Sequence, residues 1–256
     1  MLEVNEIFGP TIQGEGKLIG TPSVFIRFGK CNLKCIGFNV EYETPSGIKK
    51  CACDSYYAVD TAFKNSWKKY KSHTEILDEV DKLLKDYNYD FNIDIVITGG
   101  EPLLYWNDVE FQKLLEFYIN KNHKVTIETN ASLNIDFTKD YQNKILFSMS
   151  VKLSNSLEPL KKRVNKSTLT KILNNSKESY LKFVIGDDFL ANAIIEINDI
   201  IKDIPKCEIF LMPLGDTASN IDKNSLDVVN LAIKYGLKYS DRLHIRLWDK
   251  DRKSVV

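Results

Sequence analysis

The sequence lacks an excess of charge of either sign, a long apolar run and a recognisable export signal. Its 256 residues carry 35 Lys and Arg against 35 Asp and Glu, so nothing draws it towards nucleic acid or an anionic membrane. No apolar stretch approaches the roughly 20 residues that span a bilayer, and residues 1–6 do not form a basic and then apolar pattern. We therefore expect a soluble, cytoplasmic protein with no nucleic-acid or membrane partner.

Histidine is also scarce. Only His73, His123 and His244 are present, and no H-E-x-x-H pattern pairs two of them on a helix. The zinc hydrolase site built on that pattern is therefore excluded. We expect all three histidines to lie in loops or at the surface.

Cysteine, in contrast, is concentrated: four of the five cysteines fall within 23 consecutive residues. Cys31 and Cys35 form one pair and Cys51 and Cys53 another, whereas Cys207 lies apart and is expected to be a structural thiol. In a reducing compartment such a cluster indicates metal or redox chemistry rather than disulfides. Thiolates suit both zinc and iron–sulfur clusters, so the cysteines alone leave both kinds of site open.

Short runs typical of β-strands alternate with amphipathic helical patterns. The expected strands are residues 23–28, 94–98, 125–129, 145–150, 180–185 and 208–214, with residues 244–248 as a further strand closing the set. The expected helices are one capped by Thr74, one carrying Phe111 to Tyr118, and two over residues 189–204 and 225–235, the last stopped by Gly236. The alternation predicts an α/β fold with a parallel sheet and outer helices. About six parallel strands fit an open, partial TIM-like barrel rather than a closed eightfold one.

Polar groups follow the ends of successive expected strands. They are Thr98 with Gly99-Gly100-Glu101-Pro102, then Glu128 and Asn130, then Ser150 and Lys152. The carboxyl ends of parallel strands face one mouth of a barrel, where ligands bind. The two glycines let the backbone approach a ligand closely, and Glu101 can accept hydrogen bonds from an ammonium group. This recurrence predicts one shared ligand site.

The cysteines and the Gly-Gly-Glu-Pro segment together resemble the radical S-adenosylmethionine superfamily. Residues 8–16 (FGPTIQGEG), residues 25–28, Cys31-Asn32-Leu33 and Cys53-Asp54-Ser55 are similar to the QueE-type 7-carboxy-7-deazaguanine synthase family of the queuosine pathway. The resemblance runs from Ile7 to about Trp248. It implies a single domain of the radical S-adenosylmethionine type over residues 1–256, with an insertion at residues 36–52 that we expect to form a hairpin turning at Pro45-Ser46.

The resemblance implies an activity and its cofactors. Family members convert 6-carboxy-5,6,7,8-tetrahydropterin to 7-carboxy-7-deazaguanine with loss of ammonia, starting from a 5′-deoxyadenosyl radical. The implied [4Fe–4S] ligands are Cys31, Cys35 and Cys53, with Cys31, Cys51 and Cys53 as the alternative set. Magnesium would bind the hydroxyl of Ser55, where threonine is usual. A homodimer and an electron donor such as flavodoxin or ferredoxin are also implied.

The resemblance further implies two sets of ligand contacts. The pterin would contact Ile12, Gln13, Gly14, Thr98 and, through its carboxylate, Arg27, whose planar guanidinium suits a carboxylate. S-adenosylmethionine would contact Ala52, Cys53, Asp54, Gly100, Glu101, Glu128, Asn130, Ser150, Val151, Lys152, Leu211, Met212, Pro213 and Leu214. Val151 stands where the family has proline. Glu15 is a candidate acid or base, with a role in stabilising the turn equally open.

Two other functions remain open at the level of sequence. A glycyl-radical activating enzyme shares the cysteines and the Gly-Gly-Glu-Pro segment, but has no need of the residue 13–16 loop together with Arg27. A zinc-stabilised binding module without catalysis would share only the cysteines. Iron and sulfide in the protein would favour an enzyme, and zinc alone would favour the module.

Overall fold

The computed structural model describes residues 1–87 and 91–249, and its main feature is one nine-stranded sheet with the order β11-β10-β9-β8-β7-β6-β2-β1-β5. Its strands are β1 (Leu2–Ile12), β2 (Pro22–Phe28), β5 (Lys68–Tyr70), β6 (Asp94–Gly99), β7 (Val125–Thr129), β8 (Leu146–Ser150), β9 (Tyr180–Ile185), β10 (Glu208–Pro213) and β11 (Lys238–Tyr239). The prediction of a single domain over residues 1–256 also takes in residues 88–90 and 250–256, which lie outside the described part.

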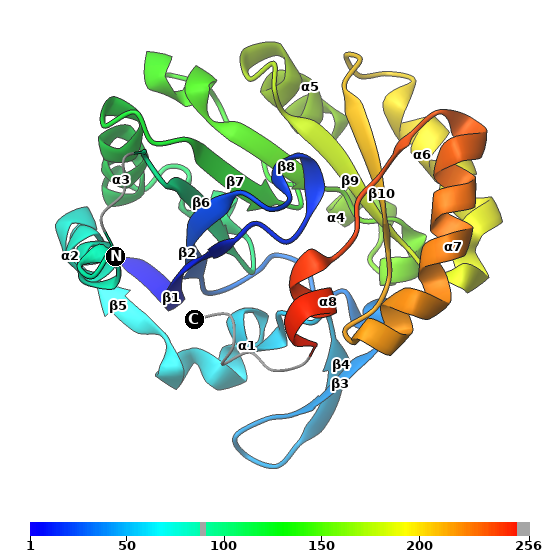
Figure 1. The fold of residues 1–256 in the computed structure, drawn as a ribbon, viewed down its shortest axis with the longest axis horizontal. Helices are drawn as coiled ribbons and strands as arrows, with labels where there is room; N and C mark the ends of the chain where they lie inside the picture. The colour runs from blue at the N-terminus through cyan, green and yellow to red at the C-terminus, as the bar shows by residue number, and fades with distance from the viewer. Residues whose placement is uncertain (88–90, 250–256) are drawn as a thin grey trace.

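The six main strands predicted from the sequence are β2, β6, β7, β8, β9 and β10. They are neighbours in that order, and every adjacent pair is parallel. Figure 1 shows them as a curved arc with helices on its outer side and no strand closing the circle. The predicted α/β fold with an open, partial barrel is therefore confirmed.

Five longer helices cover the outer side of the arc (Figure 1). They are α2 (His73–Leu84), α3 (Val109–Asn120), α5 (Lys166–Asn175), α6 (Leu190–Ile201) and α7 (Ala218–Tyr235). The predicted start of α7 is wrong by seven residues, because Thr217 caps the helix by accepting from the N–H of Asn220. Its predicted stop at Gly236 is confirmed, with a left-handed φ of 65° that favours glycine. Helix α5 was not predicted from the sequence.

Near the chain termini one predicted strand is wrong and one strand was not predicted. Residues 244–248 form a helix, α8 (Leu243–Trp248), and the edge position of the sheet belongs to β11. The alternation of Ile245 and Leu247 with polar residues suits a strand in the sequence, but in the helix Ile245 is buried while Leu247 is 55% exposed, because residues two apart face different sides of a helix. At the other end, β1 was missed. It pairs antiparallel with β2 and carries the chain to Ile12.

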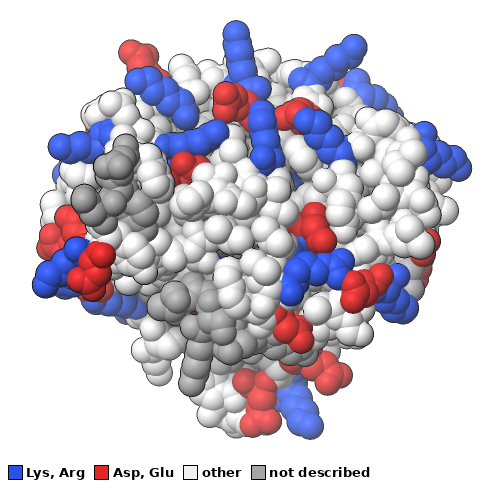
Figure 2. All heavy atoms as spheres, viewed as in Figure 1, with Lys and Arg blue, Asp and Glu red and all other residues white. Residues whose placement is uncertain are grey.

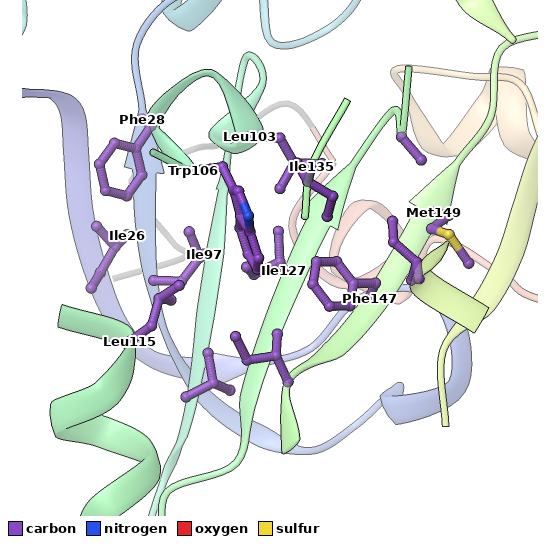
Figure 3. Packing of buried hydrophobic residues seen from close by; sticks show 14 of the residues in the cluster. Ile26, Phe28, Ile97, Leu103, Trp106, Leu115, Ile127, Ile135, Phe147 and Met149 are labelled. Atoms are coloured by element: carbon purple, nitrogen blue, oxygen red, sulfur yellow. The ribbon is translucent and has the colours of Figure 1, made fainter. Parts of the chain in front are cut away.

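The main core lies between the outer face of the sheet and the helices. Side chains at alternate strand positions point outward and bury one another, as expected for a period of two. Figure 3 shows this packing for Ile26, Ile97, Ile127 and Phe147, from four successive strands, against Leu115 of α3. The intervening positions point to the inner side of the arc, where the cavity lies.

A hairpin projects from the open side of the arc, near the short helix α1 (Tyr56–Val59). Its strands β3 (Val40–Glu43) and β4 (Lys49–Ala52) pair antiparallel, and Thr44 accepts from Gly47 N–H across the turn. The predicted hairpin within residues 36–52 is therefore confirmed. The ring of Tyr42 stacks on Tyr56 with 4.2 Å between centroids, which fixes the hairpin to the segment after Cys53.

The surface agrees with the balanced charge of the sequence. Figure 2 shows basic and acidic side chains interspersed on one face. None of the helices in the described ranges combines the length and apolar character needed to cross a bilayer.

Candidate active site

A cavity of about 1480 Å³ lies at the carboxyl ends of the parallel strands. Each main strand contributes at least one inward side chain. These are Arg27 from β2, Thr98 from β6, Glu128 from β7, Ser150 from β8, Lys182 from β9 and Met212 from β10. The predicted convergence of strand-end polar groups on one mouth is therefore confirmed for every predicted group except the Glu101-Pro102 end of the Gly-Gly-Glu-Pro segment.

Three thiols open into this cavity: Cys31, Cys35 and Cys53. Cys51, which lies in β4 of the hairpin opposite Glu41, does not line it. Burial raises the pKa of Cys35 to about 11 and that of Cys53 to about 12, and it raises the pKa of Cys31 as well. Thiols in this state lose their protons when a metal binds.

The donor set fits a cluster rather than one ion. Nowhere in residues 1–87 and 91–249 do three His, Cys, Asp or Glu side chains converge tightly enough to hold a single metal ion. Three thiols spread around one cavity suit a [4Fe–4S] cluster, in which each thiolate binds a different iron. Three thiolates leave the fourth iron open to a small molecule.

The cysteine loop is held against the strand ends by specific contacts. The carboxylate of Glu158 accepts from the backbone N–H groups of Lys34 and Cys35, at 2.5 and 3.0 Å. A Cβ at Gly100 would lie 2.1 Å from the carbonyl oxygen of Lys30, so only glycine lets β6 end this close to the loop. Asn130 Nδ2 lies 3.9 Å from Cys31 Sγ. The Gly-Gly-Glu-Pro segment thus packs beside the thiols.

Glu101 joins the ends of two strands through hydrogen bonds. Its side chain is fully buried and accepts three hydrogen bonds, from Leu103 N–H at 3.0 Å, Thr129 Oγ1 at 2.6 Å and Asn130 N–H at 2.8 Å. Burial raises the pKa of Glu101. Its side chain does not line the cavity, and its three hydrogen bonds organise the ends of β6 and β7; the contact with an ammonium group stays a prediction.

Four other expected S-adenosylmethionine contacts also do not line the cavity: Ala52, Val151, Leu211 and Pro213. Val151 and Leu211 belong to the outer core, because they alternate with the inward Ser150 and Met212. The remaining expected residues all line it. These are Ile12, Gln13, Gly14, Glu15, Arg27, Cys31, Cys35, Cys53, Asp54, Ser55, Thr98, Gly100, Glu128, Asn130, Ser150, Lys152, Met212 and Leu214.

Gln13 is the clearest sign of a ligand site. Its side chain is 1% exposed and lines the cavity, yet neither amide atom has a hydrogen-bond partner in the described part of the chain. An unpaired buried amide destabilises a fold by about 1–3 kcal/mol. A ligand that both donates and accepts hydrogen bonds would remove that cost.

Arg27 stands nearby, held by three side chains. Its Nε donates to Glu6 Oε1 at 2.6 Å, and its guanidinium lies 5.5 Å from the ring centroid of Phe8 and 5.7 Å from that of Tyr57. The hydrogen bond to Glu6 uses Nε and not the two terminal nitrogens, and the residue lines the cavity. This edge of the guanidinium suits a ligand carboxylate bound through two parallel hydrogen bonds.

A buried ionic network surrounds Glu15. It forms ion pairs with Lys182 and with Arg242, whose Nε lies 2.9 Å from Glu15 Oε1. Burial alone would raise the pKa of Glu15, but Lys182 and then Arg242 outweigh it and hold that pKa well below its usual value. Arg242 also pairs with Asp54 at 2.5 Å and opposes burial there, which leaves the pKa of Asp54 at about 2. Both carboxylates are therefore ionised at neutral pH.

His244 belongs to the same network, so the expectation of a loop or surface position is wrong for this residue. It lines the cavity with Nε2 3.9 Å from Glu15 Oε1, and burial lowers its pKa to about 4. A Cβ at Gly14 would lie 2.0 Å from its Nδ1. The ring is neutral at pH 7 and packs directly on the residue 13–16 loop.

Lys182, Arg242 and His244 were not among the predicted site residues. Lys182 did leave a signal, because a lysine inside the apolar run YLKFVI of a parallel strand is unusual. Arg242 and His244 lie more than 200 residues from Glu15 in the chain. Only the folded chain brings them together.

Ser55 lies next to Asp54 at the cavity. Its hydroxyl lines the cavity and donates to Asp54 Oδ1 at 3.3 Å. A hydroxyl beside a carboxylate supplies the hard oxygen donors that Mg²⁺ takes in proteins.

The chain matches the 4Fe-4S single cluster domain family over residues 12–173. It is 30% identical over 272 residues to a 7-carboxy-7-deazaguanine synthase of Halobacterium salinarum, covering 97% of this chain and 91% of that protein. It is 28% identical over 256 residues to the protein of the same name in Rhodopirellula baltica, covering 95% and 85%. The crystal structure of QueE from Escherichia coli superposes with a TM-score of 0.62 at 20% identity, covering 95% of this chain and 94% of that one. This last likeness supports the fold.

Proposed function

This chain belongs to the 7-carboxy-7-deazaguanine synthase family of radical S-adenosylmethionine enzymes, and we propose that its cavity is where the family's reaction takes place. That reaction converts 6-carboxy-5,6,7,8-tetrahydropterin to 7-carboxy-7-deazaguanine with loss of ammonia, a step of 7-deazapurine biosynthesis. One observation carries the proposal: three thiols, an unpaired buried amide and a guanidinium edge open into the same space. Membership of this family argues against the two alternative functions, a glycyl-radical activating enzyme and a zinc-stabilised binding module.

Cys31, Cys35 and Cys53 would hold the [4Fe–4S] cluster. When bound, the cluster supplies the electron that cleaves S-adenosylmethionine. The alternative set with Cys51 in place of Cys35 is disfavoured, because Cys51 does not line the cavity whereas Cys35 does. Asn130 and the N–H of Leu33, 3.4 Å from Cys31 Sγ, would donate to the sulfur of Cys31 and stabilise its thiolate form.

S-adenosylmethionine would lie along the ends of β6 to β10. Gly100 and Asn130 adjoin the thiols, and Lys152 Nζ donates to Ser150 Oγ at 2.8 Å inside the cavity. Met212 and Leu214 offer apolar surface on the far side. Asp54 lies beside Cys53, and Glu128 accepts from Thr98 Oγ1 at 2.8 Å, between this half and the pterin half.

The pterin would lie over β1 and β2. The amide of Gln13, between Ile12 and Gly14, would pair with the polar edge of its ring, and the terminal nitrogens of Arg27 would bind its carboxylate. Thr98 would complete this half. Because Glu15 is held ionised, it would accept hydrogen bonds from the ring N–H groups rather than donate a proton.

Four finer points belong to the same proposal. Ser55 would bind Mg²⁺, with Asp54 orienting its hydroxyl. The chain would act as a homodimer in the cytoplasm. A flavodoxin or a ferredoxin would supply the electron, since the cluster must be reduced before each cleavage.

Anaerobic reconstitution with iron and sulfide, followed by incubation with S-adenosylmethionine, a reductant and the carboxy-pterin, tests the function. We expect 5′-deoxyadenosine and 7-carboxy-7-deazaguanine to form. The variants Cys31→Ala, Cys35→Ala and Cys53→Ala should each lose cluster loading and turnover, while the matched control Cys51→Ala keeps both. Full activity in Cys35→Ala together with loss in Cys51→Ala would reverse the ligand assignment, and absence of product from the wild-type protein would refute the function.

A further inference from the structure

The residue 13–16 loop is fastened to the C-terminal part of the chain at three successive positions. Three hydrogen bonds do this: Gly16 N–H to Ser240 Oγ at 2.7 Å, Leu243 N–H to the Gly14 carbonyl at 2.8 Å, and Arg242 Nε to Glu15 Oε1 at 2.9 Å. Two segments more than 200 residues apart therefore form one wall of the cavity.

Arg242 joins this wall to two further loops. One terminal nitrogen donates to Asp54 Oδ2 at 2.5 Å, in the loop that carries Cys53, and the other donates to the carbonyl of Gly215, just after β10. The side chain is 10% exposed. A guanidinium presents its donors in a fixed plane, and here they meet three separate segments.

The charge of Arg242 matters because its partners are buried carboxylates. Burial disfavours the ionised form of Glu15, and Lys182 and then Arg242 oppose that effect; Arg242 also forms an ion pair with Asp54 at 2.5 Å. A neutral side chain at this position would leave both groups with less compensation. Lysine would keep the charge but, with one compact ammonium group, could not hold both carboxylates and the carbonyl of Gly215 in the same geometry.

We propose that Arg242 is a positioning residue for the pterin half of the cavity. It fixes the Glu15 carboxylate and, through the loop, the unpaired amide of Gln13 in the orientation that receives the pterin. This rests on the proposed function, because the pterin is the ligand concerned. Arg242 acts before the chemistry, so its loss weakens pterin binding more than it slows the reaction of bound pterin.

The test compares Arg242→Gln with Arg246→Gln in the full-length, cluster-reconstituted enzyme. Arg246 lies one turn later in α8 and pairs with Asp241 and Asp222 outside the cavity. The control therefore also removes two arginine ion pairs close in the chain to Arg242, but ones whose partners are 70% and 31% exposed. Initial rates at varied pterin separate KM from kcat, and iron content reports cluster loading.

We expect Arg242→Gln to raise the KM for the pterin at least about tenfold while kcat stays within about threefold. Arg246→Gln should change neither. Arg242→Lys should give an intermediate KM, and it keeps the test usable if the glutamine variant fails to fold. Titration of the pterin into protein without S-adenosylmethionine, followed by calorimetry, should show the same loss of affinity without any turnover.

A merely structural role predicts another result. Loss of folded enzyme lowers the apparent kcat and leaves KM unchanged, so that outcome, or an equal KM in Arg242→Gln and Arg246→Gln, overturns the inference. The proposed function is judged separately by the wild-type enzyme. If the wild type does not convert the pterin, the function fails; if it does and Arg242→Gln keeps the wild-type KM, only the inference fails.

Discussion

The outer and inner faces of the parallel sheet carry different kinds of side chain. Along β9, Leu181 and Phe183 point outward into the core, whereas Lys182 points inward to the cavity. In β2, Ile26 and Arg27 divide in the same way. Strands of parallel sheets are usually apolar on both faces, so folding alone does not explain the charged inner positions. The outer face stabilises the protein, and the inner face lines the cavity in which we propose that ligands bind.

Two buried glutamines illustrate the loss of stability that an unpaired polar side chain causes. Gln13 and Gln142 are both 1% exposed. The amide of Gln142 is paired, donating to Gln112 Oε1 at 2.7 Å and accepting from the N–H of Thr138 at 2.8 Å, whereas the amide of Gln13 has no partner among the described residues. The two glutamines are equally buried but differ in pairing. This indicates that Gln142 stabilises the fold, whereas the amide of Gln13 is available to a ligand.

The largest expected effect lies on the outer face. Replacing Phe183, which is fully buried, with alanine should lower the free energy of unfolding by about 3–5 kcal/mol, because a cavity replaces the ring. Urea denaturation measures this. The control Phe117→Ala removes a ring that is 37% exposed and should cost less than about 1 kcal/mol. Equal losses would contradict the assignment of the core to the outer face.

Lys182, which precedes Phe183 in β9 and points to the inner face, should affect activity rather than stability. Lys182→Met removes a cation paired with Glu15, so kcat/KM for the pterin should fall roughly a hundredfold with cluster loading retained. Lys171 pairs with Asp136 at 2.6 Å on the exposed side of the protein, and Lys171→Met should leave kcat/KM within about twofold. If both lysine variants keep full activity, the inner face is not the binding face.

A smaller effect is expected at the carboxylate site. Arg27→Lys keeps the positive charge but loses the planar pair of donors, so the KM for the pterin should rise about tenfold. The side chain of Arg163 is 6% exposed, against 15% for Arg27, and it pairs with Glu196 away from the cavity. Steady-state assays of Arg163→Lys should show an unchanged KM, whatever its stability. A similar KM in both variants would remove Arg27 from the pterin site.

The smallest expected effect is a change in the free energy of unfolding that should have opposite signs for the two glutamines. Gln13→Met removes an unpaired buried amide and should raise the free energy of unfolding by about 1 kcal/mol, while weakening pterin binding. Gln142→Met breaks a paired amide and should lower stability by about 1–3 kcal/mol, with pterin binding unchanged. Chemical denaturation of the ligand-free proteins measures both. A loss of stability in Gln13→Met would mean that its amide is paired within the protein.

Much of this fold could be predicted because its signals are local. The β-branched run that forms β6 and the alternation with helices are properties of short segments, and they placed all six main strands. The errors fall where short segments are ambiguous. Residues 244–248 suit a strand or a helix equally well over a single turn, and Gly9 and Pro10 hid the strand character of β1.

The candidate site divides in the same way. Cys31, Cys53 and Gln13 belong to short motifs, so the sequence identified them. Leu211 and Glu101 also belong to such motifs, yet their side chains do not line the cavity. The face on which Leu211 lies depends on the alternation of side chains along β10, and the direction of the Glu101 carboxylate depends on the hydrogen bonds that it accepts.

The sequence by itself determined the positions of the six main strands along the chain, the concentration of cysteines and the likeness to a family, since each depends on residues that are close together in the chain. The tertiary structure alone decided that Cys35 rather than Cys51 lines the cavity, and that Glu15 meets Lys182, Arg242 and His244 there. The physical reason is distance along the chain. A buried charge is tolerated only beside its partners, and partners that come from opposite ends of a sequence are placed by the path of the whole chain.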